Sequence, residues 1–155
     1  MIKPRPTKRC VTAAGNPLET VGLNTAETGP QGGGQMRHAR VFLVEDETLI
    51  RLMLAEMIEE LGHQIVAEAG SIESALPLAE TAAFDIAILD VNIGGYYIDK
   101  VAQTIVRRGL PFIFVTGYAK AALPPAFIDR PHLQKPCLRE MLRREITSAL
   151  GPEAA

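Results

Sequence analysis

Short apolar runs alternate with longer amphipathic stretches from Arg40 to the end of the chain. Short apolar runs predict strands, and apolar residues repeated every three or four positions predict helices. We expect strands at Arg40–Val44, Gln64–Glu68, Ile86–Leu89, Phe112–Val115 and a short His132–Gln134. We expect helices at Thr48–Leu61, Ile72–Ala82, Ile98–Arg108 and Leu138–Leu150. This alternation predicts right-handed parallel βαβ units, and hence an α/β fold with one sheet covered on both faces.

The first and last predicted helices each carry an apolar face, which is typical of a helix that packs on a core. The residues expected on the face of the first helix are Leu49, Leu52, Met53, Met57 and Leu61. Those expected on the face of the last helix are Leu138, Met141, Leu142, Ile146 and Leu150. Gly62 and Gly151-Pro152 are placed to end these two helices.

Pro77 lies inside the sequence that predicts the second helix. In a helix that begins at Ser71 it would occupy the interior, where a proline costs about 3 kcal/mol. If Ser74 is instead the N-cap, Pro77 falls in the first turn, where no hydrogen-bond donor is lost. We therefore expect either a start at Ser74 or a kink.

Residues 1–36 show no sustained period of 2 or 3.6 and contain "GNPLET", "AETGP" and "QGGGQ". A segment so rich in Gly, Pro, Thr and Asn predicts disorder. Periodic structure starts just after Met36, so one hypothesis is that translation begins there, and the other is a short flexible arm. We expect one domain over residues 37–151, followed by a tail of residues 152–155.

Composition and charge exclude several classes of protein. No run approaches the roughly 18 apolar residues of a membrane span, and no apolar segment follows the basic N-terminus, so we expect a cytoplasmic protein without a membrane partner. The two cysteines, Cys10 and Cys137, form neither a disulfide framework nor a metal-ligand pattern. Residues 1–40 hold six Lys and Arg against two Glu, whereas residues 41–155 hold ten against sixteen acidic residues. The domain is therefore acidic, which argues against binding of nucleic acid.

Polar side chains follow the predicted strands at their carboxyl ends. Glu45 and Asp46 come after the first strand, Asp90 after the third, Thr116 after the fourth and Lys135 after the fifth. In an open parallel sheet these strand ends meet at one edge, where ligands bind. Singly, each residue has an ordinary explanation, such as an acidic entry into a helix or a solvated charge. Together and in this order, they predict a site.

The chemistry of these residues suits a metal ion and a phosphoryl group. Carboxylates held together repel one another, so the cluster predicts a bound cation. Hard oxygen ligands with space for water suit Mg²⁺. The metal and Lys135 would then offset the charge of a phosphoryl group, with Thr116 as a hydroxyl donor. Asp90 would be the nucleophile that forms an acyl phosphate.

At these residues the chain resembles the receiver domain of two-component response regulators. The motifs that carry the resemblance are "VFLVEDE", "ILDVN", "FVTGY" and "LQKP", and the resemblance extends over about residues 39–150. It implies a flavodoxin-like, doubly wound sheet of five parallel strands in the order 2-1-3-4-5. It also implies that Asp90 is the phosphoacceptor and that Thr116 and Lys135 sense the phosphoryl group.

The resemblance implies a set of metal ligands as well. Asp46 and Asp90 become direct ligands of Mg²⁺, and Glu45 becomes an acid that acts through metal-bound water. The backbone carbonyl of Asn92 completes the protein's share of the metal shell. The Lys135–Pro136 peptide is expected to be cis, which an X-Pro bond permits.

The sequence departs from the common receiver pattern in three places. His132 stands where most receivers have an aromatic residue, which leaves open whether His132 or Tyr118 replaces the usual aromatic switch. Three prolines after Thr116 predict a short or irregular fourth helix. Gly94-Gly95 predicts an open, mobile loop after the phosphoacceptor. The stretch "PFIFVTGY" is similar to the FAT GUY subgroup, several members of which act in alphaproteobacterial stress signalling with HWE or HisKA2 kinases.

The resemblance implies a single-domain response regulator that is phosphorylated on Asp90 by a sensor histidine kinase or a phosphotransfer protein. Its output would be contact with an unknown downstream protein, and its only catalysis would be self-catalysed phosphotransfer and slow autodephosphorylation. The alternative is a receiver-fold interaction module that is not phosphorylated, which His132 and the altered fourth helix favour. A small hydrolase with Asp90 as nucleophile is a further alternative, although the sequence offers no cap or insertion to bind a substrate.

Overall fold

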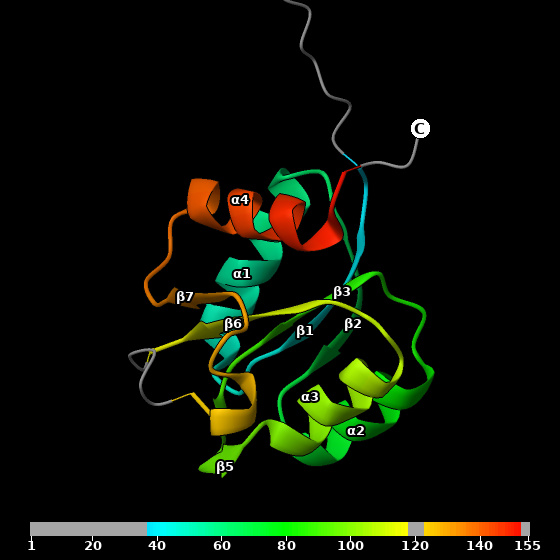
Figure 1. Cartoon of the computed structure of the whole chain (residues 1–155). Coiled ribbons are helices and arrows are strands. Elements are labelled where there is room, and N and C mark those ends of the chain that lie inside the picture. Colours follow the sequence, from blue (N-terminus) through cyan, green and yellow to red (C-terminus); the bar gives the residue numbers. More distant parts are fainter. Residues whose placement is uncertain (1–36, 118–122, 153–155) are drawn as a thin grey trace, which may run out of the picture. The chain divides into compact units, whose positions relative to one another are not determined.

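Five parallel strands form one sheet in the order β2-β1-β3-β6-β7 (Figure 1). The strands are β1 (Arg40–Val44), β2 (Gln64–Ala69), β3 (Ile86–Leu89), β6 (Phe112–Thr116) and β7 (His132–Gln134). This computed structural model describes residues 37–117 and 123–152, so the predictions for residues 1–36 lie outside it. When only the strands of this sheet are counted, the order is 2-1-3-4-5, and the predicted doubly wound fold is confirmed.

The helices cover the two faces of the sheet in pairs (Figure 1). α1 (Thr48–Glu60) and α4 (Arg139–Leu150) lie on one face, and α2 (Ile72–Thr81) and α3 (Asp99–Arg107) lie on the other. Successive side chains of a strand point to opposite faces. Val41 and Leu43 therefore join the core beneath α1 and α4, whereas Phe42 and Val44 join the core beneath α2 and α3. Within residues 37–117 and 123–152, no helix combines the length and the apolar character needed to cross a bilayer.

The face predicted for α1 is correct only in part, because Met57 and Leu61 pack against the core. The residues that α1 buries are Leu54 and Ile58, neither of which belongs to the predicted face. Three residues of the predicted face are instead exposed by 79%, 58% and 54%, namely Leu49, Leu52 and Met53. The face predicted for α4 is correct in part, because Leu142 and Ile146 are buried while Leu138 and Met141 are exposed. Since α1 is apolar around most of its circumference, packing rather than sequence period decides its orientation.

α2 begins at Ile72, as the apolar pattern predicts, so the alternative start at Ser74 is wrong. The N-cap is Ser71, whose hydroxyl oxygen accepts a hydrogen bond from the Ser74 amide at 3.2 Å. Pro77 therefore lies inside the helix, where it cannot donate to the preceding turn. Ala75 and Ala79 are wholly buried in the core, and this packing offsets the cost of the proline.

A short 3₁₀ turn, η2 (Pro125–Phe127), precedes β7. It is the only helical element in residues 123–131, so the predicted short or irregular segment is confirmed there. Tyr118 lies outside the described residues. The turn is anchored by Phe127, whose ring centroid lies 5.7 Å from that of Phe112 and 6.2 Å from that of Phe114.

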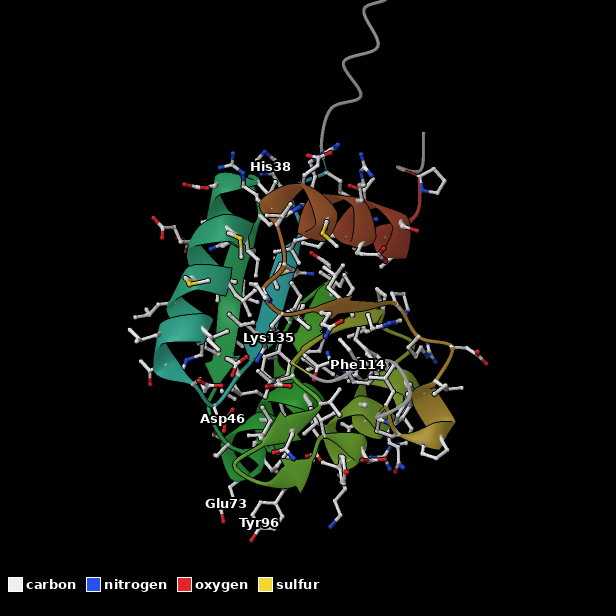
Figure 2. The ribbon with its side chains drawn as sticks, turned by 90° about the vertical axis from the view of Figure 1, so that its left-hand side faces the viewer. His38, Asp46, Glu73, Tyr96, Phe114 and Lys135 are labelled. Atoms are coloured by element: carbon white, nitrogen blue, oxygen red, sulfur yellow. The ribbon has the colours of Figure 1, made fainter. Side chains whose placement is uncertain are left out.

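A buried imidazole lies at the opposite end of the sheet from the predicted site. His63 is 8% exposed, and its Nδ1 accepts a hydrogen bond from the Ala39 amide at 3.2 Å. The buried Nε2 carries the proton in this tautomer and has no hydrogen-bond partner within the described residues. Burial, followed by the charge of His38, lowers the pKa of His63. Figure 2 shows His38 far from Asp46, at the other end of the domain.

We expect His63 to make the protein less stable in acid. The unfolded chain takes up a proton near pH 6.5 while the folded protein resists protonation, so the free energy of unfolding falls as the pH drops below that value. The loss attributable to one proton is at most about 1.4 kcal/mol per pH unit. The variant His63→Asn retains an acceptor without titrating. Its urea unfolding between pH 7 and 5 is expected to have a smaller pH slope than that of the wild type, and equal slopes would contradict the prediction.

Candidate functional site

Backbone hydrogen bonds of the sheet extend one residue beyond the strands and fix the predicted site residues in place. The bonds run from the Glu45 amide to the Ala69 carbonyl at 3.0 Å, from Asp90 to Val44 at 2.9 Å, and from Lys135 to Thr116 at 2.8 Å. Parallel register therefore determines which side chains meet at this edge. The ladder brings Glu45, Asp90 and Lys135 together across three strand ends.

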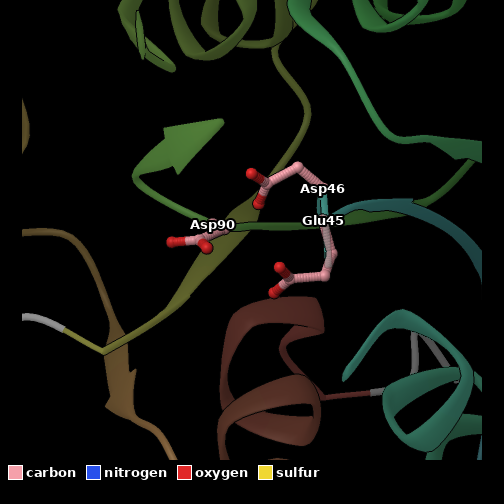
Figure 3. Close-up of side chains that lie close together, drawn as sticks. All are labelled: Glu45, Asp46 and Asp90. Atoms are coloured by element: carbon pink, nitrogen blue, oxygen red, sulfur yellow. The ribbon is translucent and has the colours of Figure 1, made fainter. Parts of the chain in front are cut away.

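Three carboxylates converge at this edge, as the sequence predicts. Glu45, Asp46 and Asp90 each offer an oxygen, and these oxygens lie within 4.8 Å of one another (Figure 3). The Glu45 side chain is wholly buried, whereas Asp90 is 7% exposed. Asp90 and Asp46 open into a pocket of about 280 Å³, which is lined by Asp46, Glu47, Asp90, Asn92, Gly117 and Lys135. The acidic cluster is thus accessible to a small ligand.

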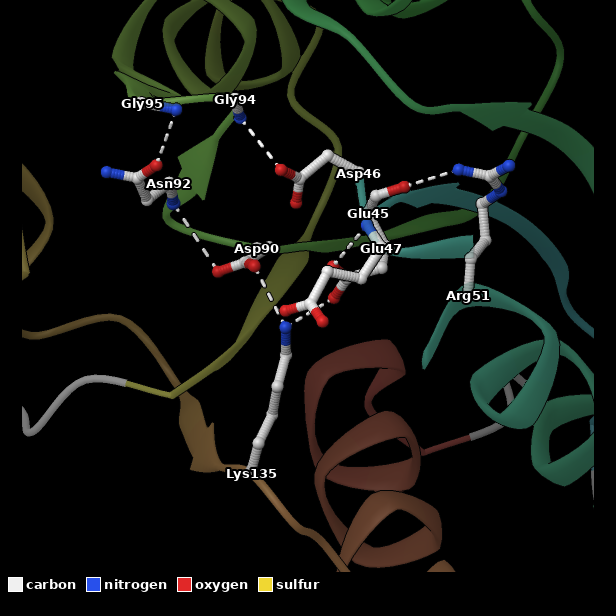
Figure 4. Close-up of polar contacts among 9 residues, drawn as sticks. All are labelled: Glu45, Asp46, Glu47, Arg51, Asp90, Asn92, Gly94, Gly95 and Lys135. Carbon is white, nitrogen blue, oxygen red and sulfur yellow. Dashed lines mark hydrogen bonds and ion pairs between the residues drawn. The ribbon is translucent and has the colours of Figure 1, made fainter. Parts of the chain in front are cut away.

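Lys135 reaches into the cluster from the end of β7. Its Nζ donates to Asp90 Oδ2 at 2.8 Å and also to Glu45 Oε2 (Figure 4). Burial opposes the charged form, but the bonds to Asp90 and Glu45 outweigh it and raise the pKa of Lys135. The ammonium therefore stays charged and bridges two of the three carboxylates.

Glu45 occupies the least favourable position for a charge. Burial is the main influence and raises the pKa of the Glu45 carboxyl, although the bond from Lys135 and the Glu47 amide, 3.1 Å from Oε1, act in the opposite direction. The nearby charge of Asp90 raises it further. Ionisation of the Glu45 carboxyl is thus unfavourable, and an additional cation nearby would stabilise the ionised form.

Two other predicted residues lie beside the cluster. Thr116 is wholly buried. It is the last residue of β6, whereas the sequence predicts that it follows the strand. The Asn92 amide lies 3.4 Å from Asp90 Oδ1, and the Asn92 side chain accepts a hydrogen bond from Gly95. The Lys135–Pro136 peptide is cis, as expected.

The segment after Asp90 is a β-hairpin rather than the open loop that we expected. β4 (Asn92–Ile93) pairs antiparallel with β5 (Tyr96–Tyr97), and Gly94 and Gly95 form the turn with φ of 59° and 87°. A two-residue turn with both φ positive requires residues such as glycine, so Gly-Gly between two short runs was a signal for this hairpin. The Gly94 amide donates to Asp46 Oδ2 at 2.9 Å (Figure 4). The hairpin therefore holds one carboxylate of the cluster, a contact that the sequence did not reveal.

Comparison with known proteins agrees with this geometry. Residues 41–147 match the response regulator receiver domain. The chain belongs to the response regulator receiver family. The resemblance found in the sequence is thereby confirmed.

Relatives of this receiver include the transcriptional regulatory protein PdtaR of Mycobacterium tuberculosis, which is 39% identical over 85 residues. That alignment covers 54% of this chain and 42% of PdtaR, so the chain spans less than half the length of this relative. The solution structure of SdrG from Sphingomonas melonis Fr1 has a TM-score of 0.65 at 36% identity and covers 73% of this chain and 96% of SdrG.

Two further structures are similar. The response regulator PhyR from Brucella abortus has a TM-score of 0.65 at 29% identity, covering 74% of this chain and 48% of PhyR. The BeF3-activated conformation of SdrG from Pseudomonas melonis Fr1 has a TM-score of 0.62 at 35% identity, covering 72% of this chain and 96% of SdrG.

The donor chemistry of this receiver suits a hard divalent cation. The three converging side chains offer carboxylate oxygens, which Mg²⁺ and Ca²⁺ prefer over nitrogen or sulfur. The pocket leaves space for water molecules, which Mg²⁺ tends to retain. The residues present therefore fit a metal ion of this class.

Replacing Glu45 with Gln is expected to stabilise the metal-free receiver at neutral pH. A carboxyl whose pKa is raised on folding contributes stability below its unfolded value of about 4.5, and this contribution is lost as the pH rises through the folded value. The Tm of Glu45→Gln should therefore exceed that of the wild type by a few degrees at pH 7, which corresponds to about 1 kcal/mol. The gain should shrink toward pH 4. The exposed Glu80→Gln in α2 serves as control, and a gain independent of pH would contradict the prediction.

Proposed function

We propose that this receiver accepts a phosphoryl group on Asp90 from a sensor histidine kinase or a phosphotransfer protein. The observation that carries the proposal is the position of the Asp90 carboxylate, which faces an open pocket and lies 2.8 Å from the Lys135 ammonium. An oxygen of Asp90 attacks the phosphorus atom of a phosphohistidine. The P–N bond then breaks, and the leaving imidazole keeps the electron pair. The Lys135 ammonium offsets the negative charge of the phosphoryl group that is transferred to Asp90.

The metal in this proposal is Mg²⁺, held by Asp46, Asp90 and the backbone carbonyl of Asn92, with Glu45 acting through a water molecule. When bound, the metal offsets the negative charge of the phosphoryl group. The fixed position of Asp46, which is hydrogen-bonded to the hairpin, suits this role. Thr116 and Lys135 are proposed to sense the phosphoryl group, because both lie at adjacent strand ends of the same edge.

An apolar surface beside the pocket supports a protein as phosphodonor. Lys135 lines the acidic pocket and also a groove of about 290 Å³ between α1 and the segment that follows β7. The residues that line the groove are Ile50, Met53, Leu54, Met57, Lys135, Pro136 and Cys137. Leu49 and Leu52, which also belong to α1, are exposed as well. A partner bound to this surface would reach the Asp90 pocket.

The output in this proposal is a contact with a downstream protein, which phosphorylation would favour by shifting a two-state equilibrium. PhyR from Bartonella quintana, a protein similar to this receiver, is described as an anti-anti-sigma factor. This description is consistent with an output through protein contact rather than through chemistry on a small molecule.

Replacement of Asp90 by Asn is expected to abolish phosphorylation. With acetyl phosphate and Mg²⁺, or with the cognate kinase, the wild type should take up radiolabelled phosphate while Asp90→Asn remains at background. The matched control is Asp129→Asn, an exposed carboxylate outside the cluster that should label like the wild type. Labelling of the Asp90→Asn protein would refute the proposal.

The alternative, an interaction module that is not phosphorylated, is favoured by the 3₁₀ turn that precedes β7 and by His132 at the usual aromatic position. Beryllofluoride mimics a phosphoryl group on a carboxylate and separates the two functions. For a phosphoacceptor we expect beryllofluoride with Mg²⁺ to move the amide resonances of Thr116 and Lys135, and Asp90→Asn to abolish these shifts. If the wild-type resonances do not respond, the interaction module becomes the better description.

A further inference from the structure

The Arg51 side chain turns back from α1 to the acidic doublet, Glu45 and Asp46. Its Nη1 donates to the Glu45 backbone carbonyl at 2.6 Å (Figure 4). Its Nε lies 4.0 Å from the Glu68 carboxylate on β2. The Arg51 side chain is 23% exposed, so the contact is well shielded from water. An ionised donor makes a hydrogen bond about twice as strong as that between neutral groups.

This contact holds the peptide group that joins Glu45 to Asp46, the two acids of the doublet. The Glu45 amide is bound to Ala69 of β2, and the Glu45 carbonyl is bound to Arg51. The carbonyl belongs to the planar peptide that joins Glu45 to Asp46, so the bond from Arg51 holds the plane from which the Asp46 backbone continues. Asp46 follows the end of β1, where the strand ladder no longer fixes the chain.

A close packing contact keeps the guanidinium in place. A Cβ at Gly70 would lie 2.8 Å from Arg51 Nη1, which is closer than real Cβ atoms approach other atoms. The backbone of Gly70 does not adopt a positive φ, so a side chain here is opposed by space alone, and the guanidinium of Arg51 would have to shift to admit it. The end of β2 thus forms a platform on which Arg51 lies.

We infer that Arg51 is a positioning residue that orients the doublet for metal binding, with Gly70 as its platform. This inference rests on the proposed Mg²⁺ site. Arg51 acts through the Glu45–Asp46 peptide and does not touch the metal. The simple electrostatic expectation has the opposite sign, because loss of a cation near three carboxylates would by itself raise the affinity for Mg²⁺. A fall in affinity on loss of Arg51 therefore reports orientation rather than charge.

The test uses Arg51→Met and Gly70→Ala in the full chain, with Mg²⁺ affinity measured by NMR titration. Both variants are expected to weaken Mg²⁺ binding about tenfold, the lower range for residues that orient metal ligands. The double variant should bind no more weakly than Arg51→Met alone, because the added Cβ acts only by displacing the guanidinium. Arg144→Met, which removes an exposed cation from α4, should leave the affinity unchanged.

A metal-free measurement separates this inference from the proposed function. The Gly94 amide donates to Asp46 from the hairpin, so its proton resonance reports the position of that carboxylate. Both variants should move this resonance without Mg²⁺, whereas loss of a purely structural contact would lower only the free energy of unfolding. An unchanged Gly94 resonance would overturn the inference, as would additive effects in the double variant. Failure of the wild type to bind Mg²⁺ while the Gly94 resonance still moves would overturn the metal site alone.

Discussion

The concentration of negative charge at the carboxyl edge of the sheet is the constraint on which the site depends. Oxygens of three carboxylates lie within 4.8 Å of one another, because the ladder of the parallel sheet extends to Glu45 and Asp90 and the hairpin holds Asp46 beside them. Such a cluster is unfavourable without a cation. In the metal-free protein the Lys135 ammonium meets this need by contacting Glu45 and Asp90 together. The same ammonium would have to share Asp90 with any metal ion or phosphoryl group that enters the pocket.

The parts of the site differ in how they are held. Backbone ladder bonds fix Glu45, Asp90 and Lys135, so their positions follow directly from strand register. Asp46 lies beyond the ladder, and its carboxylate is held by the turn of the β4–β5 hairpin. Because both glycines of this turn have positive φ, the segment forms a defined hairpin turn rather than an irregular loop. The acid that most needs orientation is thus supported by contacts from outside the sheet.

The sequence predicted the features that depend on local pattern. All five strands of the main sheet were placed to within a residue, because apolar runs between polar ends are strong signals in a sheet buried on both faces. The predicted strand boundaries also placed the acidic residues of the site at the carboxyl ends of the strands. Contacts made by backbone groups left no such signal. Neither the bond from Arg51 to the Glu45 carbonyl nor the bond from Gly94 to Asp46 could be read from residue types.

The two wrong predictions for helices have different physical causes. The alternative start of α2 at Ser74 was wrong because the cost of Pro77 was weighed alone, whereas burial of Ala75 and Ala79 and the cap at Ser71 favour the longer helix. The face of α1 was correct only at Met57 and Leu61, because apolar residues surround most of the helix and the sheet could bury either side.

The error in α1 carries functional information. The fold gains little stability from Leu49, Leu52 and Met53, which remain exposed although they satisfy a helical apolar pattern. Sequence rules tend to fail where a surface is kept for function rather than for folding. These side chains lie along the helix that borders the Lys135 groove, and Lys135 also lines the acidic pocket. Of these exposed side chains, Met53 also lines the groove, so in the proposed function it is the residue of α1 that a protein partner bound beside Asp90 would cover.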